Sequence, residues 1–196
     1  MAPPRKHDSD SILDATRTLV LRDGPRAASV TAIARESGAP VGTLYHRFGN
    51  RDGVLAAAWL RALERFQRRA LAAAADPDPL AAAVAMASSQ VGFAREQPED
   101  ARLLLTLRRD DLLDADPSEE LRASLDAINK PLLARLRELT QALRASTDPR
   151  ALDAVTRAVV DLPNAAIRRH ARAGTRPPAW LQEDVASAAR RLLEQR

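Results

Sequence analysis

The sequence predicts an all-α protein. Good helix formers, above all alanine, leucine and arginine, are abundant, and no stretch alternates β-branched and polar residues as a half-buried strand would. Asp-Pro steps at 78–79, 116–117 and 148–149 each precede apolar residues spaced three and four apart. An Asp side chain can accept hydrogen bonds from the first turn of a helix, and Pro at the next position gives up an N–H that has no partner there. These steps therefore predict three helix starts.

Composition sets the broad class of the protein. A chain of 196 residues that is 45% hydrophobic and 29% charged can form one helical domain or a small domain joined to a larger one. It has no cysteine, which excludes disulfides and thiolate metal sites, and we expect a cytoplasmic protein because no segment resembles a signal peptide or a membrane span. The net charge of +4 permits an acidic partner without proving one.

The first fifty residues predict short helices separated by glycines. We expect helices at about 9–22, 30–36 and 40–47, with Ser29 capping the second, and a longer fourth helix capped by Asn50. Residues 1–8 are expected to form a flexible arm. Two short helices joined by a glycine-containing turn predict a helix-turn-helix at about 30–49, whose second helix enters the major groove of DNA.

The rest of the chain predicts longer amphipathic helices, the last two at about 149–173 and 178–195. Pro131 and Pro163 lie within apolar stripes without changing their phase. We therefore expect kinks in long helices at these prolines, although a break at either remains open.

Residues 9–66 resemble the DNA-binding domain of the TetR family of transcriptional regulators. The resemblance rests on the combined spacing of residues in all four predicted helices: Ile12, Ala15, Leu19, Gly24, Ser29, Ile33, Ala34, Gly38, Gly42, Thr43, Leu44, Tyr45, Phe48, Asn50 and Arg51. The remainder of the chain shows no motif and agrees with the family only in its helical layout.

The resemblance implies a set of DNA contacts in this chain: Ser29, Thr31, Val41, Gly42, Thr43, Tyr45, His46 and Arg51. Gly42 would let the helix backbone approach the DNA, and Leu44 and Phe48 would face inward. The chain departs from the family pattern at Pro40, where a serine is usual. It departs again at Val41, which can offer only apolar contact to a thymine methyl group. Tyr45 alone would more often be a core residue, and His46 could equally be a solvated side chain.

The resemblance also implies how the protein works. Residues 9–52 would bind DNA, and residues 53–196 would bind an effector and dimerise through the last two long helices. The expected protein is a repressor that binds a pseudo-palindromic operator as a homodimer and is released by a small apolar effector. The candidate effector pocket consists of Trp59, Phe66, Met86, Phe93 and Leu104, although such residues are more often core.

Enzymatic chemistry is not expected. The histidines His7, His46 and His170 are far apart in the sequence, and we find no metal-binding spacing, no phosphate-binding glycine loop and no nucleophile motif. We predict no cofactor and no metal. Two alternatives stay open: an activator with the same DNA-binding domain, and a helical protein-interaction module that has lost specific DNA binding.

Overall fold

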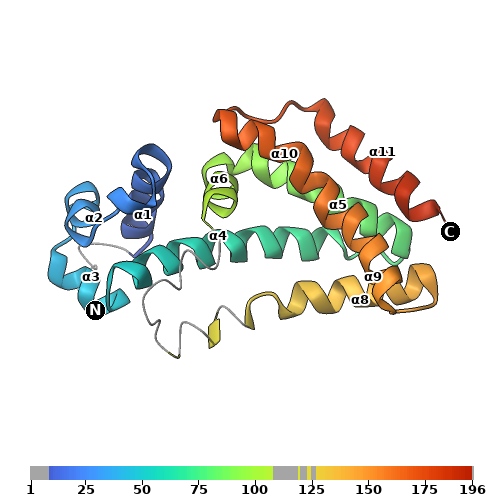
Figure 1. The fold of residues 1–196 in the computed structure, drawn as a ribbon, viewed down its shortest axis with the longest axis horizontal. Helices are drawn as coiled ribbons and strands as arrows, with labels where there is room; N and C mark the ends of the chain where they lie inside the picture. The colour runs from blue at the N-terminus through green and yellow to red at the C-terminus, as the bar shows by residue number, and fades with distance from the viewer. Residues whose placement is uncertain (1–8, 108–118, 120–122, 125–126, 196) are drawn as a thin grey trace, which may run out of the picture. The chain divides into compact units, whose positions relative to one another are not determined.

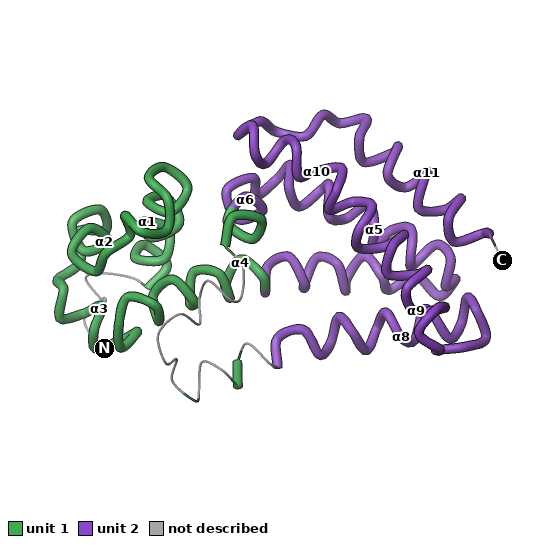
Figure 2. The backbone as a smooth tube through the Cα atoms, viewed as in Figure 1, with its two compact units in different colours: residues 1–63, 103–125 green, residues 64–102, 126–196 purple. Residues whose placement is uncertain are grey.

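The computed structural model describes residues 9–107, 119, 123–124 and 127–195, and the regular elements in these residues are helices (Figure 1). The predicted all-α class is confirmed. The chain divides into two compact units, residues 1–63 with 103–125 and residues 64–102 with 126–196 (Figure 2). Of the described helices, none is both long enough and apolar enough to cross a membrane. The predicted arm at residues 1–8 lies outside the described residues.

Residues 9–63 of the first unit, called the head below, contain three complete α-helices, a 3-10 turn and the first half of a fourth helix. Their bounds agree with the predicted helices to within one residue at most ends. These elements are α1 (Ser9–Asp23), the 3-10 turn η1 (Pro25–Ala27), α2 (Val30–Ser37), α3 (Val41–Phe48) and the first half of α4 (Arg51–Ala73).

The head has its own apolar core. Helix α1 packs against α2, and α2 packs against α3. The fully buried side chains include Ile12, Leu19, Ile33, Leu44 and Val54. Each side chain of this size contributes about 1.5–3 kcal/mol when it is removed from water. The core therefore holds the short helices α2 and α3, which are too short to be stable alone.

Two ion pairs connect the first and last helices of the head. Arg61 of α4 reaches the Oδ1 atoms of Asp10 and Asp14 on α1, each at 2.6 Å. The Arg61 side chain is mostly buried, whereas both carboxylates are largely exposed. These ion pairs hold α1 against the middle of α4.

The second unit contains the longer helices. Helix α5 packs against α8, α10 and α11. Asp78 and Asp148 cap α5 and α9 through their side chains, which confirms two of the three predicted Asp-Pro starts. The third, at 116–117, lies outside the described residues. The elements are α5 (Pro79–Glu96), α8 (Lys130–Arg144), α9 (Pro149–Thr156), a π-helical turn η3 (Arg157–Asp161), α10 (Leu162–Ala173) and α11 (Trp180–Glu194); α6 (Pro98–Thr106) begins here and ends in the first unit.

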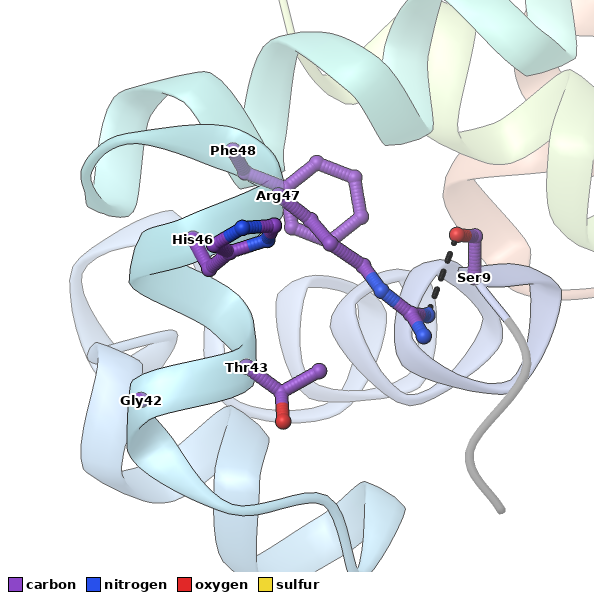
Figure 3. Close-up of a pocket in the computed structure, with 6 residues that line it drawn as sticks. All are labelled: Ser9, Gly42, Thr43, His46, Arg47 and Phe48. Carbon is purple, nitrogen blue, oxygen red and sulfur yellow. Dashed lines mark hydrogen bonds between the residues drawn. The ribbon is translucent and has the colours of Figure 1, made fainter. Parts of the chain in front are cut away.

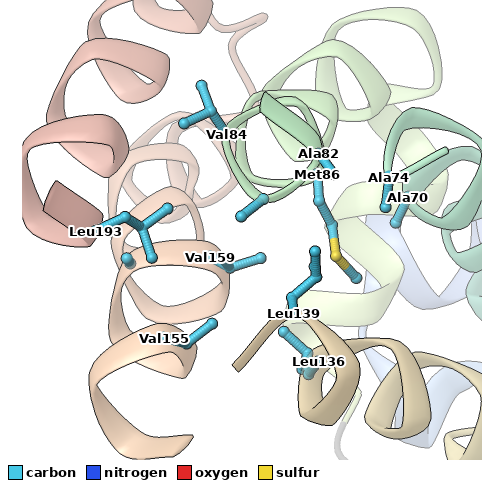
Figure 4. Packing of buried hydrophobic residues seen from close by; sticks show 12 residues of the cluster. Ala70, Ala74, Ala82, Val84, Met86, Leu136, Leu139, Val155, Val159 and Leu193 are labelled. Carbon is cyan, nitrogen blue, oxygen red and sulfur yellow. The ribbon is translucent and has the colours of Figure 1, made fainter. Parts of the chain in front are cut away.

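A cluster of small and branched apolar side chains forms the core of the second unit (Figure 4). Met86 of α5 lies in it beside Leu136 and Leu139 of α8, and Val155 and Val159 come from α9 and η3. Alanines supplied by α4 and α5 keep the helix backbones close. The cluster joins the last part of α4 to the C-terminal helices.

The cap of α9 is a charged one. The Ala151 N–H donates to Oδ1 of Asp148 at 2.8 Å, and the Ser146 hydroxyl donates to Oδ2 at 2.8 Å. These bonds, the backbone bond first, hold the pKa of the Asp148 carboxyl below its usual value. The ionised cap therefore stabilises the start of this helix.

The two internal prolines behave differently from each other. Pro131 lies in the first turn of α8, directly after a turn at residues 128–129, so the expectation of a kink within a long helix is wrong at this position. Proline suits a first turn because its missing N–H would have no helical partner there. The alternative that the sequence left open, a break at Pro131, is what the structure shows.

Pro163 lies inside a continuous helical run from 149 to 173. An α-helix would pair the N–H of residue 163 with the carbonyl of Val159, but proline has no N–H. The run widens into the π-helical turn η3 just before Pro163, and the side-chain amide of Gln90 on α5 donates to the Val159 carbonyl. Gln90 thus supplies, from a neighbouring helix, the hydrogen bond that Pro163 cannot make.

Candidate nucleic-acid interface

The turn between α2 and α3 has the local structure that its sequence predicts. Ser29 caps α2, because its hydroxyl accepts the Ala32 N–H at 3.2 Å. The residue that follows α2 is Gly38, whose φ of 68° lies in the left-handed region that glycine adopts readily. Pro40 then precedes α3 without a side-chain cap. The two short helices are therefore joined by a three-residue turn.

Helix α3 has one buried and one exposed face. Leu44 is completely buried in the head, as predicted. On the other side, Val41 is 39% exposed and Tyr45 is 53% exposed, and both are among the most exposed large apolar residues of the described chain. Gly42 and His46 are also exposed, whereas Thr43 and Phe48 are half-buried. Residues 41 and 45 lie one helical turn apart, so they form one ridge.

Nothing inside the described chain requires a glycine at position 42. Its φ is not positive, and a Cβ added there would meet no other heavy atom within 4 Å. Glycine costs about 1 kcal/mol relative to alanine in a helix. The space beside the Gly42 backbone is open on the exposed face of α3.

A groove runs beside α3 at the start of α1 (Figure 3). In it, Nη1 of Arg47 donates to the hydroxyl of Ser9 at 3.2 Å. This bond ties the third helix to the first residue of α1. Sequence reasoning did not identify either of these two residues, because they are 38 positions apart. The groove is lined by Ser9, Gly42, Thr43, His46, Arg47 and Phe48.

The predicted contacts outside α3 occupy different environments. Thr31 is exposed on the first turn of α2, next to the Ser29 cap. Arg51 is engaged within the head: Nε donates to the Ala28 carbonyl at 3.1 Å, and Nη2 donates to the Pro25 carbonyl. Its Nη1 pairs with Asp52 at 2.8 Å. The structure therefore gives Arg51 a second role that the sequence did not indicate, which is to hold the segment before α2 against the start of α4.

Comparison with known proteins supplies the family. Residues 12–58 match the family model described as bacterial regulatory proteins, tetR family. The head belongs to the TetR family. A comparison with curated proteins finds no match in sequence.

Solved structures resemble nearly the whole chain. The fatty acid degradation regulator FadR from Bacillus halodurans aligns with a TM-score of 0.72 at 18% identity, over 96% of this chain and 100% of that one. A TetR-like transcriptional regulator from Rhodococcus sp. RHA1 aligns at 0.68 and 22% identity, over 95% and 96%. FadR from Bacillus subtilis, solved with stearoyl-CoA, aligns at 0.71 and 16% identity, over 95% and 98%. At these identities the likeness shows that the TetR-type fold extends beyond the head.

The predicted effector-pocket residues fall into both units. Phe66 and Phe93 of the second unit meet edge to face, with ring centroids 5.6 Å apart, and Phe66 packs against the core cluster that contains Met86. Trp59 and Leu104 belong to the first unit. Trp59 is 8% exposed, and its indole N–H has no hydrogen-bond partner among the described residues.

In the part of the chain that the structure describes, His, Asp and Glu side chains do not form a group of three or more that could hold a metal ion.

Proposed function

We propose that this protein is a ligand-responsive, sequence-specific transcriptional regulator, a repressor that binds a pseudo-palindromic operator as a homodimer. The observation that carries the proposal is the exposed ridge of Val41 and Tyr45 with the open backbone of Gly42, on the recognition helix of a TetR-family head. Exposed apolar side chains gain nothing from burial, and an uncompensated helical glycine costs stability in the free protein. A DNA surface bound at this face would cover the exposed side chains and would occupy the open space beside Gly42.

The head offers both kinds of DNA contact. Thr43, Tyr45 and His46 carry hydrogen-bonding groups that can reach phosphates or base edges from the major groove. Ser29 and Thr31 stand at the N-terminus of α2, where hydroxyls and backbone N–H groups suit a phosphate. We assign Arg51 an indirect contribution, because its guanidinium already binds the Pro25 and Ala28 carbonyls.

Dimerisation through the last two helical runs would place two recognition helices on one face of the DNA. Trp180 and Leu192 of α11 are 55% and 42% exposed in the single chain. Two subunits with their α3 helices about 34–36 Å apart, or a multiple of that spacing, would read two half-sites of a pseudo-palindrome. Sedimentation equilibrium tests this step: we expect a dimer at micromolar concentration, and a monomer would contradict it. Trp180→Glu should favour the monomer.

Effector binding would then shift the dimer toward a spacing that does not fit the operator. We place the effector against the apolar part of the second unit near Phe66, Met86 and Phe93. Helix α4 is continuous from Arg51 to Ala73, so it begins beside the recognition helix and ends in the core of the second unit. The stearoyl-CoA in Bacillus subtilis FadR makes a long acyl chain the first effector to test.

A selection from a random duplex library tests the DNA-binding part. Purified protein at moderate salt should enrich one pseudo-palindromic sequence. Tyr45→Ala should fail to retain it, and Tyr45→Phe separates loss of the hydroxyl from loss of the ring. Leu133→Ala, on an exposed residue of α8, is a matched control that should bind normally. If no sequence is enriched, a helical protein-interaction module becomes the better account.

Fluorescence anisotropy on the selected duplex tests the effector part. Stearoyl-CoA and stearate should each be titrated against the preformed complex. Release of the duplex by either compound supports an acyl effector, and comparison of the two shows whether the CoA group is needed. If a series of apolar compounds leaves the operator affinity unchanged, the effector part of the proposal is wrong.

A further inference from the structure

We propose that Val41 recognises the C5-methyl group of a thymine in each operator half-site. This inference rests on the proposed function and names the base feature that the recognition helix reads. Val41 is the first residue of α3 and is 39% exposed. The N-terminal residues of a recognition helix are those that meet base edges in the major groove. A valine there has only methyl groups to offer.

The chemistry of the major groove limits what such a side chain can read. Guanine, cytosine and adenine present hydrogen-bond donors and acceptors, and thymine alone adds an apolar group. Valine cannot form a hydrogen bond with a base donor or acceptor. Packed against such a group, the valine side chain would remove water from it and leave it without a partner. Contact with the thymine methyl is therefore the favourable arrangement.

The rest of the exposed face of α3 strengthens the assignment. Side chains that read guanine, adenine or cytosine by paired hydrogen bonds are Arg, Lys, Asn, Gln, Asp and Glu. The exposed residues of α3 are Val41, Gly42, Tyr45 and His46, and none belongs to that set. Arg47 is the arginine of this helix, and it is half-buried with Nη1 bound to the Ser9 hydroxyl.

Gly42 makes close approach of a base edge possible. A side chain at this position would stand beside Val41 on the exposed surface, where the structure has open space. Without it, the backbone at the start of α3 can lie deeper in the groove. The valine methyl groups can then reach van der Waals distance of a base. An exposed valine next to an unconstrained glycine gains nothing from packing inside the chain, so both are explained by one external contact.

The test removes one methyl group from the DNA. In the duplex recovered by selection, each thymine of one half-site is replaced in turn by deoxyuridine, which pairs identically but lacks the methyl group. Burial of a single methyl-sized group corresponds to about a fourfold change in affinity. We expect one position to show a loss of this size by fluorescence anisotropy, and the same change in both half-sites to give about 16-fold because separated positions add.

A protein variant completes the cycle. Val41→Ala should bind the thymine duplex more weakly and should lose most of the difference between thymine and deoxyuridine at that one position. Val41→Thr, which keeps one methyl group at the same volume, should retain part of it. Leu133→Ala should leave the difference unchanged. Circular dichroism checks folding, which we expect to be intact because Val41 is an exposed residue.

The outcomes separate this inference from the proposed function. A selected duplex with no methyl-sensitive position, or with a sensitivity that persists in Val41→Ala, overturns the role of Val41 and leaves the regulator intact. Failure to select any duplex overturns both. Loss of the sensitivity in Val41→Ala alone, with Leu133→Ala unchanged, establishes the contact.

Discussion

Replacing Gly42 with alanine should separate the stability of the protein from its binding to DNA. The backbone at this position is not in the left-handed region, and an added Cβ would meet no heavy atom within 4 Å. Alanine is favoured over glycine in a helix by about 1 kcal/mol. Because the position is in the first turn of α3, we expect a gain of up to about 1 kcal/mol in the free energy of unfolding. For a chain of this size, that corresponds to roughly 2–4 °C in Tm.

The same methyl group should weaken operator binding. If the DNA approaches the Gly42 backbone, the added Cβ fills the space that the DNA needs. Overfilling a packed contact costs about 1–3 kcal/mol, which corresponds to roughly a five- to 150-fold rise in Kd. The variant should therefore be more stable and bind less tightly, a combination that general damage to the fold does not produce.

Urea denaturation and fluorescence anisotropy on the selected duplex measure the two effects. Gly38→Ala is the matched control in the same head, because it also has open space but a φ of 68°. There alanine should lower the stability by about 1–2 kcal/mol, the cost of a left-handed residue with a Cβ. If Gly42→Ala raises stability and leaves Kd unchanged, the DNA does not approach this backbone. If it lowers stability, the position is more constrained than the geometry indicates.

Three further substitutions test the supporting structure. Gln90→Met should lower the free energy of unfolding by about 1–3 kcal/mol, because it leaves the buried Val159 carbonyl unpaired. The loss should be smaller in a Pro163→Ala background, which restores the helical N–H. Strictly additive effects of the two substitutions in urea denaturation would contradict this. Asp148 has a lowered pKa in the folded state, so the stability that its carboxylate contributes is present above about pH 4 and is lost as the pH falls. Asp148→Asn keeps a side-chain cap that does not titrate. It should therefore weaken the pH dependence of unfolding in acid, monitored by circular dichroism. Arg51→Lys keeps the positive charge but loses the planar guanidinium that binds two carbonyls at once. Operator affinity should therefore fall, while its dependence on salt concentration stays unchanged. Full affinity in this variant would contradict a positioning role for Arg51.

Local signals predicted most of the head and the starts of the long helices. Ser29, Asn50, Asp78 and Asp148 each bond to backbone N–H groups two or three residues ahead, so the whole interaction lies within one short window of sequence. The left-handed Gly38 is another local feature, because its conformation depends on the missing Cβ. Such elements can be predicted because few distant contacts can override them.

Features made by distant residues could not be predicted. The π-helical turn depends on Pro163, which is visible in the sequence, and on Gln90, which is 73 residues earlier and gives no local sign of its role. The sequence around Pro163 is equally consistent with a break in the helix. A break is what the structure shows at Pro131. At Pro163, the continuation of the helix therefore goes with a hydrogen bond from the helix packed beside it.

Arg51 shows why a DNA contact cannot be assigned from motif position alone. An arginine at the start of α4 could satisfy its donors with phosphate oxygens or with backbone carbonyls, and the sequence does not distinguish these acceptors. The residues just before α2 present the Pro25 and Ala28 carbonyls to it, so the guanidinium holds together the segment from which α2 begins. Val41 and Tyr45 differ because both are exposed on α3, the recognition helix of a TetR-family head. Exposure on that helix is stronger evidence for a contact with DNA than motif position alone, and the predicted interface therefore centres on α3.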